Sequence, residues 1–326
     1  MGLTVAVTGP TGDIGISAVT ALEREPAVDT IIGMARRPFD PSSRGWVKTI
    51  YRQGDILDRE AVDALVADAD VVVHLAFIIM GSRDESARIN LQGARNVFEA
   101  SVGSVRPRRL VYTSSVAAYG YYPDNPVPLT EDVPTRGSPE HYYSAQKAAC
   151  EALLTDISKD SSLEVFILRP CVVAGPKARA LARSMPWNKL PGPLRAAAKL
   201  VPMLKPVVPD PGFPLQLVHH DDVAAAIALA ATAPTPPGSY NIAGDGVVTV
   251  GDVAKALGGR PVPVPAAAAS AASAAVSRLP FVPSILEWLH VARTSVVMDT
   301  AKAKKELGWQ PVHSSADTLA ALARAV

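Results

Sequence analysis

The first half of the chain alternates short apolar runs with stretches of helical periodicity. Continuous apolar runs, typical of strands buried on both faces of a sheet, cover residues 3–8, 30–34, 71–76, 110–113 and 165–168. The segment 47–52 alternates apolar and polar residues, which predicts a strand nearer a sheet edge. Helical spacing covers residues 16–22, 59–67, 90–102 and 143–157, and Asp58 is placed to cap the second of these helices. This alternation predicts βαβ units and a doubly wound parallel α/β sheet.

A glycine-rich turn follows the first apolar run. Gly9, Gly12 and Gly15 come at three-residue spacing, directly before the helical stretch at 16–22. Without Cβ atoms, such a turn lets a pyrophosphate approach the backbone N–H groups, and the dipole of the following helix favours its charge. The spacing differs from the commonest dinucleotide fingerprint, Gly-x-Gly-x-x-Gly, so the turn alone leaves an ordinary tight turn open.

The pattern changes after residue 170. Proline and glycine are frequent from residue 175 to residue 214, and the helical stretches become short and alanine-rich. We therefore expect a dinucleotide-binding Rossmann domain over residues 1–175, with returns near 218–232 and 240–244. Residues 176–326 are expected to form mainly a smaller, discontinuous substrate-binding region.

Composition narrows the classes of partner. Apolar residues make up 48% of the 326 residues and the formal net charge is +1, so nothing global draws the protein to nucleic acid or anionic lipid. The two cysteines, Cys150 and Cys171, lack metal-binding spacing, and no signal peptide precedes the first strand. We expect a reduced, cytoplasmic protein whose longest early apolar stretch, 71–80, is too short to span a membrane.

Tyr143 and Lys147 are four residues apart in a helical stretch, which places them on one face. A lysine ammonium beside a phenol favours the phenolate and lowers the tyrosine pKa, so the pair can act as a general acid/base near neutral pH. Ser114 and Ser115 follow the apolar run at 110–113, at the carboxyl end of a predicted parallel strand, where ligands bind.

With these residues in place, the chain resembles the extended short-chain dehydrogenase/reductase family, also named the NAD-dependent epimerase/dehydratase family. The resemblance runs in the family's order over nearly the whole chain. The matching segments are TGPTGDIG at 8–15, GDILD at 54–58, VVHLA at 72–76, INLQGARNVFEA at 89–100, VYTSSVAAYG at 111–120, YSAQK at 143–147, LRPCVVAGP at 168–176, VHHDDVA at 218–224, YNIAG at 240–244 and ELGWQP at 306–311.

The resemblance implies catalytic roles for three residues. Tyr143 would be the acid/base, Lys147 would hold the nicotinamide ribose and tune Tyr143, and Ser115 would be the catalytic serine, with Ser114 as the alternative. Asn90 would support the site from below. The residues implied to bind the cofactor are Gly9, Thr11, Gly12, Asp13, Ile14, Gly15, Asp55, Ile56, Leu75, Ala76, Tyr143, Lys147 and Pro170. Among these, Asp55 would accept from the adenine amino group and Ile56 would flank the ring.

The end of the second apolar run bears on the choice of cofactor. Family members that prefer NAD usually carry an acidic residue there, which accepts from the ribose 2′-OH. This chain reads GMARRP, with Arg36 and Arg37 and no acid before Asp40. A guanidinium suits a 2′-phosphate, so we favour NADP(H) over NAD(H), with a solvated arginine pair as the alternative.

The expected function is an NAD(P)-dependent oxidoreductase that moves a hydride between nicotinamide and a carbonyl or alcohol carbon of a small molecule. Cys171 stands where sugar-nucleotide enzymes of the family commonly have asparagine, and Val116 stands where many dehydratases have an acid. These departures favour a less polar substrate. A sugar-nucleotide epimerase or dehydratase with retained NAD is the alternative, and a non-catalytic NADP-sensing protein is a second one.

Other polar and aromatic residues have weaker indications. The run from His219 to Asp222 has metal-ligand chemistry, but adjacent histidines are expected to point apart, and we expect no metal. The resemblance implies a homodimer formed through the helices at 90–102 and 143–157. Residues left open between pocket and ordinary surface or core roles are Arg179, Arg183, Arg195, Trp187, Met203, Phe213 and Trp288.

Overall fold

The computed structural model of the protein describes residues 2–79, 83–184, 205–265 and 296–326. Trp187, Arg195, Met203 and Trp288 lie outside the described residues. Among the described helices, none is long and apolar enough to cross a lipid bilayer.

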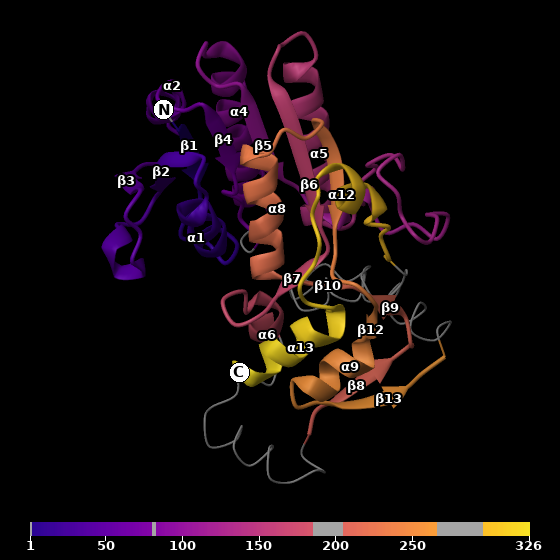
Figure 1. Cartoon of the computed structure of the whole chain (residues 1–326). Helices are drawn as coiled ribbons and strands as arrows, with labels where there is room; N and C mark the ends of the chain where they lie inside the picture. Colours follow the sequence, from indigo (N-terminus) through magenta and orange to yellow (C-terminus); the bar gives the residue numbers. More distant parts are fainter. Residues whose placement is uncertain (1, 80–82, 185–204, 266–295) are drawn as a thin grey trace.

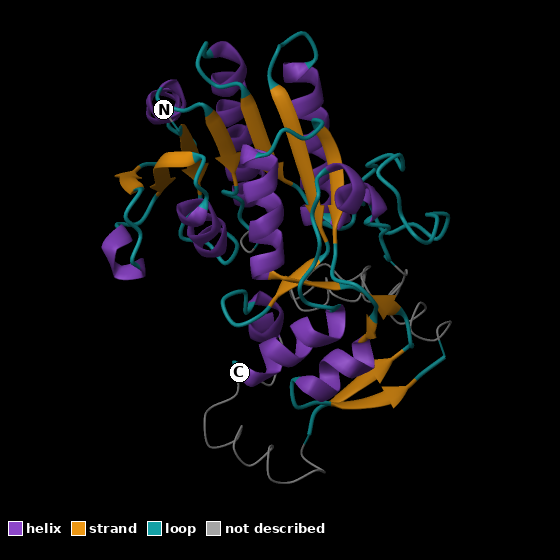
Figure 2. Ribbon diagram, viewed as in Figure 1, coloured by secondary structure: helices purple, strands orange, loops and turns teal. Residues whose placement is uncertain are grey.

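Seven parallel strands form the central sheet, which Figure 2 shows in orange. Their spatial order is β11 (Gly238–Ile242), β6 (Glu164–Pro170), β5 (Arg109–Thr113), β4 (Val71–His74), β1 (Leu3–Thr8), β2 (Val28–Ala35) and β3 (Thr49–Gln53). The chain runs from β1 outward to β3 and then returns to build β4, β5 and β6 on the other side. This order confirms the predicted doubly wound α/β sheet, with its topological switch point between β1 and β4. The predicted edge strand is β3.

Helices cover both faces of this sheet. Helices α1 (Gly15–Arg24) and α8 (His220–Thr232) pack together on one face, and α2 (Arg59–Ala67), α4 (Gly93–Gly103) and α5 (Tyr142–Ser158) lie on the other (Figure 1). Successive strand residues therefore enter different cores: Val5 and Val7 pack on the α8 side, and Ala6 packs on the α4 side. Burial on both faces explains why the strands read as continuous apolar runs.

The helices follow the sequence signals, with one exception. Asp58 caps α2 by accepting from the N–H groups of Glu60 and Ala61, as predicted. The single helix predicted over 90–102 is instead a π-helical turn, η2 (Arg88–Gln92), followed by α4. At their junction, a Cβ on Gly93 would lie 2.3 Å from Ile56 Cδ1, so the absence of a side chain lets this segment pack closely on Ile56.

A smaller region packs below the carboxyl ends of the strands. It contains α6 (Ala180–Ser184), α9 (Val250–Ala256), α13 (Ser315–Arg324), and the strand pairs β7–β10 (Val172–Ala174, Leu217–His219), β8–β13 (Val207–Asp210, Arg260–Pro263) and β9–β12 (Pro214–Leu215, Val248–Thr249). Between these elements the polypeptide returns twice to the main sheet. Strand β11 pairs with β6, and α12 (Ala301–Glu306) packs on β11. Asp222 of α8 fastens the C-terminal segment by accepting from the N–H groups of Val312 and His313, each at 3.0 Å.

The core on the α4 side generates a stability prediction. Phe98 is fully buried, with its ring edge-on to Tyr112 at 5.4 Å and to His74 at 5.6 Å. We expect Phe98→Ala to lower the free energy of unfolding by about 3–5 kcal/mol, because it removes apolar contacts and leaves a cavity. Urea denaturation measures this, with Val105→Ala as the control, since Val105 is 103% exposed. A loss no larger than that of the control would contradict the packing.

Candidate active site

The turn after β1 is held against the segment that follows β4. Gly9 has φ of +73°, and a Cβ there would lie 2.9 Å from the backbone of Ala76. A Cβ on Gly15 would lie 2.1 Å from the Gly9 carbonyl oxygen, whereas one on Gly12 would have no neighbour nearer than 3.5 Å. Glycine is therefore required at positions 9 and 15 by the turn itself, and Gly12 leaves open space beside it.

The first turn of α1 is suited to an anion. Its cap residue, Ile14, makes no side-chain cap hydrogen bond, and the turn carries no acidic residue. Backbone N–H groups and the positive end of the helix dipole at such a turn favour negative charge. The residues present thus fit a dinucleotide pyrophosphate. Asp13 is directed elsewhere, since its carboxylate lies 3.5 Å from Arg183 Nη2 of α6.

A polar hollow of about 430 Å³ lies at the ends of β2 and β3 and is lined by Arg36, Gln53, Gly54 and Asp55. The backbone that carries Arg36 is fixed from β3: Tyr51 donates its hydroxyl to the carbonyls of Ala35 and Arg37, and Gln53 donates its amide to that of Arg36 at 3.0 Å. These bonds hold an exposed arginine segment at the mouth of the hollow.

Other predicted cofactor residues lie around these two features. Leu75 donates its N–H to Thr8 O at 3.2 Å, which aligns the segment after β4 with β1. Asp55 accepts from Leu57 N at 3.0 Å through Oδ1. Ile56 is only 7% exposed, so its side chain has little surface left to flank an adenine ring. Thr11 lies in the glycine turn and Pro170 ends β6.

Ser115, Tyr143 and Lys147 converge at the carboxyl end of β5. Ser115 caps the short helix η3 (Val116–Tyr119) by accepting from Ala117 N at 3.2 Å, and its hydroxyl lies close enough to Tyr143 to oppose the rise in that residue's pKa. Lys147, one turn after Tyr143 on α5, has its Nζ 5.9 Å from the centre of the Tyr143 ring. Ser114 points away, because its hydroxyl donates to Glu151 at 2.5 Å. Of the two serines, Ser115 is the one that contacts Tyr143.

The Lys147 ammonium is buried and has protein partners. It is 3% exposed and donates to Thr113 O at 2.8 Å and to the Tyr112 hydroxyl at 3.4 Å. Burial lowers the pKa of Lys147 to about 8, against the opposing effects of Cys150 and Glu151. Its Nζ also lies 3.7 Å from the centre of the Phe77 ring.

Phe77 also lines this site, and no sequence motif indicated it. Its ring covers Lys147 and stands edge-on to Tyr143 at 5.5 Å, so it contacts both members of the pair. Asn90 fixes the neighbouring Ile78 by accepting from its N–H at 2.8 Å and donating to its carbonyl at 2.9 Å. Phe77 follows Leu75 by two residues, just after the parallel strand β4. Its place after the carboxyl end of a strand is the one sequence feature that could have suggested a role at the site.

The prediction that Lys147 lowers the pKa of Tyr143 is wrong for this structure. Burial raises the pKa of Tyr143, and the opposing effect comes from its hydrogen bond with Ser115. The ammonium instead faces the Thr113 carbonyl, the Tyr112 hydroxyl and the Phe77 ring.

The histidine cluster also differs from expectation. The rings of His219 and His220 do not point apart, because their centres are 4.1 Å apart, and His313 stacks on His219 at 3.9 Å. His220 Nδ1 lies 2.9 Å from both Ser17 Oγ and Asp221 Oδ1. His219, His220 and Asp221 offer ligand atoms within 4.8 Å of one another, a separation that a metal ion could bridge.

His74 lies in the core at the end of β4. It is 1% exposed, and its Nδ1 lies 2.7 Å from Thr8 Oγ1, but its Nε2 is buried without a hydrogen-bond partner. Burial, with a smaller contribution from Lys147, lowers the pKa of His74 to about 3.

Comparison with known proteins agrees with the fold described above. The model of the NAD dependent epimerase/dehydratase family matches residues 5–243. An uncharacterised protein of Mycobacterium tuberculosis is 26% identical over 315 residues, which are 94% of this chain and 80% of the relative. Human 3 beta-hydroxysteroid dehydrogenase type 7 is 32% identical over 174 residues, 47% of this chain and 44% of that protein. The structure of UDP-glucose 4-epimerase from Thermotoga maritima, at 20% identity, superposes with a TM-score of 0.72 and covers 99% of this chain and 98% of its own.

The neutral His74 makes stability dependent on pH. An unfolded histidine has a pKa near 6.5, whereas folded His74 has a pKa of about 3. Below pH 6.5 the unfolded chain takes up a proton that the folded chain does not, so the free energy of unfolding falls as the pH drops. We expect this one residue to contribute a slope of up to about 1.4 kcal/mol per pH unit. Urea denaturation between pH 7 and pH 5 should show a shallower slope for His74→Asn, and parallel slopes would show that folding leaves the pKa of His74 unchanged.

Proposed function

Because the chain belongs to the NAD dependent epimerase/dehydratase family, we propose that it is an NAD(P)-dependent oxidoreductase that uses Ser115, Tyr143 and Lys147. The observation that carries the proposal is the convergence of the three side chains, with Ser115 beside Tyr143 and the Lys147 Nζ 5.9 Å from the centre of the Tyr143 ring. These three side chains lie at the carboxyl end of β5. The glycine turn lies at the same end of β1, and β4 alone separates the two strands. Ligands of open α/β sheets bind at this edge.

The chain's residues have separate tasks in the proposed reaction. The nicotinamide dinucleotide, when bound, supplies or accepts the hydride. Ser115 donates a hydrogen bond to the substrate oxygen, and Tyr143 gives a proton to that oxygen in reduction or removes it in oxidation. Lys147, whose Nζ lies 5.9 Å from the centre of the Tyr143 ring, would hold the nicotinamide ribose beside Tyr143. Ser115 and Lys147 are buried and Tyr143 is partly buried, so these charge effects are larger than they would be in water.

We assign Arg36 and Arg37 to binding of the 2′-phosphate of NADP(H). The family is described as NAD-dependent, so this assignment is specific to the present chain. Arg36 lines the hollow that also contains Asp55, and no ion pair to either arginine is found within the described ranges. Guanidinium groups free of a carboxylate can take a phosphate as their counter-ion. Tyr51 and Gln53 hold the backbone of this segment in place, so less order has to be created on binding.

The proposed substrate is a small carbonyl or alcohol. The similarity to a 3 beta-hydroxysteroid dehydrogenase agrees with an apolar alcohol, and the likeness in fold to UDP-glucose 4-epimerase keeps sugar-nucleotide epimerisation as the alternative. Cofactor turnover separates them. A reductase oxidises added NADPH in the presence of aliphatic or aromatic aldehydes and ketones, whereas an epimerase converts UDP-glucose with no net change in cofactor. Absence of both reactions with tight NADPH binding would instead support a cofactor-sensing protein.

The Tyr143→Phe variant tests the proposed proton donor. We expect Tyr143→Phe to bind cofactor normally and to lose about 100- to 10,000-fold in kcat, because it removes the proton but retains the ring. NADPH oxidation and calorimetric cofactor binding measure the two properties. Tyr142→Phe is the matched control: it is the adjacent tyrosine of α5, and its hydroxyl donates to Ile79 O at 2.6 Å. Full turnover by Tyr143→Phe would exclude the assignment.

The Arg36→Ala variant tests the proposed preference for NADP(H). We expect Arg36→Ala to raise the Kd for NADP⁺ about tenfold or more and to leave the Kd for NAD⁺ nearly unchanged, since only NADP⁺ carries the 2′-phosphate. Arg44→Ala, an exposed arginine of the following helix η1 (Pro41–Arg44), is the control. Equal effects on both dinucleotides would show that Arg36 does not read the phosphate.

A further inference from the structure

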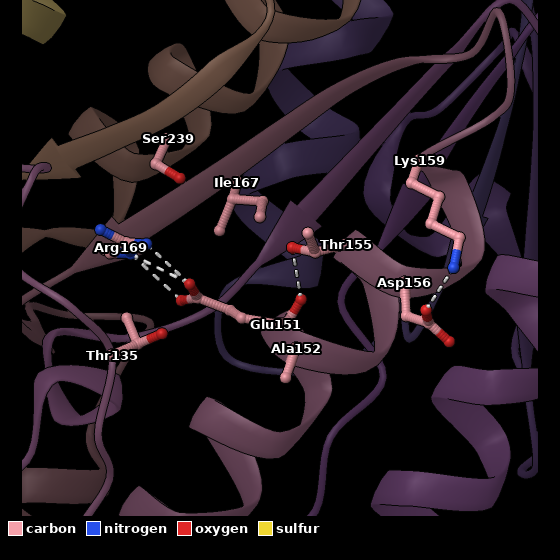
Figure 3. A pocket seen from close by; sticks show the side chains of 9 residues that line it. All are labelled: Thr135, Glu151, Ala152, Thr155, Asp156, Lys159, Ile167, Arg169 and Ser239. Atoms are coloured by element: carbon pink, nitrogen blue, oxygen red, sulfur yellow. Dashed lines mark hydrogen bonds and ion pairs between the residues drawn. The ribbon is translucent and has the colours of Figure 1, made fainter.

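A buried ion pair joins the helix that carries Tyr143 to the central sheet. Glu151 of α5 and Arg169 of β6 are 3% and 6% exposed. Arg169 Nη2 lies 2.7 Å from Glu151 Oε2, and its Nε lies 3.1 and 3.2 Å from the two carboxylate oxygens. Figure 3 shows the two side chains facing each other beside Ile167. Several directed hydrogen bonds fix the geometry of this pair.

Each member of the pair also holds one end of the turn that contains Ser115. Glu151 Oε1 accepts from the hydroxyl of Ser114, the residue before Ser115, at 2.5 Å. Arg169 Nη1 donates to the hydroxyl of Tyr119, the last residue of η3, at 2.8 Å. The segment from Ser114 to Tyr119 is thus fastened at its beginning and at its end to one ion pair.

The middle of the turn has its own tie to α5. Ser144 donates its hydroxyl to Ala117 O at 2.6 Å, and the Ser115 hydroxyl accepts from the N–H of the same residue at 3.2 Å. Ser115 therefore follows the turn that carries it. The turn is placed relative to α5 by Ser144 at its centre and by Glu151 and Arg169 at its ends.

We propose that Glu151 and Arg169 are a positioning pair that sets the distance between Ser115 and Tyr143. The catalytic meaning of this pair rests on the proposed function. Glu151 is well placed for the task because it follows Tyr143 by two helical turns and Lys147 by one on the same face of α5. The cost of removing both charges from water offsets much of the electrostatic attraction between them. We therefore expect the pair to fix the geometry of the turn and to add little to the free energy of unfolding.

Removal of Glu151 or Arg169 would leave a buried charge unpaired and threatens folding. The test therefore uses Ser114→Ala and Tyr119→Phe, each of which removes a tie to the turn and leaves the ion pair in place. Thr155→Val is the matched control, since Thr155 lies one turn after Glu151 and, among the described residues, its hydroxyl donates only to the Glu151 backbone carbonyl, at 3.0 Å. Cooperative unfolding of each variant in urea establishes that the comparison is made on folded chains.

The readout is the NMR signal of Tyr143 in the full chain, isotope-labelled at the hydroxyl-bearing ring carbon of tyrosine and assigned by its loss in Tyr143→Phe. Ser115→Ala provides the position of this signal without the serine hydrogen bond. We expect Ser114→Ala and Tyr119→Phe to move the signal toward that position and Thr155→Val to leave it in place. A signal that neither variant moves, or that Ser115→Ala itself does not move, would overturn the proposal.

Turnover is measured separately, so the two proposals can fail independently. In the NADPH-oxidation assay, Ser114→Ala and Tyr119→Phe should lower kcat about tenfold to a hundredfold with an unchanged KM for NADPH. If the Tyr143 signal moves but the protein shows no redox turnover, the oxidoreductase proposal is rejected and the positioning role of Glu151 and Arg169 is kept. Redox turnover that is equal in all variants, with an unmoved signal, retains the oxidoreductase and removes the pair.

Discussion

The structure depends on the close approach of two backbones, the Gly9 turn and the segment after β4. A side chain at position 9 would collide with Ala76, and one at position 15 would collide with the Gly9 carbonyl. Because these positions are bare, β1 can deliver the start of α1 directly beside the ends of β4 and β5. The start of α1, which is suited to an anion, and the polar side chains after β5 therefore share one edge of the sheet, where ligands of open α/β sheets bind.

Local patterns were sufficient to predict the parts of the fold in which each residue has one dominant task. Continuous apolar runs marked the strands because the sheet is buried on both faces, and Asp58 marked the start of α2 because a carboxylate satisfies free N–H groups there. The spacing of Tyr143 and Lys147 placed them on one face of a helix, and the structure brings Ser115 to the same place.

The remainder depended on contacts between distant segments. Phe77 covers Lys147 only because η2 and Asn90 hold the segment after β4 against α5, and neither contact has a local signature. The pKa of Tyr143 rises because tertiary packing removes water from it, an effect that a four-residue spacing cannot report. The two adjacent histidines come together for a similar reason: His219 ends a strand and His220 begins a helix, so the alternation assumed for a continuous strand does not apply.

The environment of Lys147 connects these observations. An ammonium has three N–H donors, and here it meets a carbonyl, a hydroxyl and the face of an aromatic ring. Under the proposed function, a ribose hydroxyl that accepts from Lys147 has to replace one of these partners. The bond to Thr113 O is short and to the backbone, whereas the bond to Tyr112 is long at 3.4 Å, and a cation–π contact in a desolvated site is worth roughly 2 kcal/mol. If the ribose hydroxyl replaces Tyr112 or Phe77 as a partner of the ammonium, the bond to Thr113 O still orients Lys147. Cofactor binding is then coupled to the position of the segment that carries Phe77.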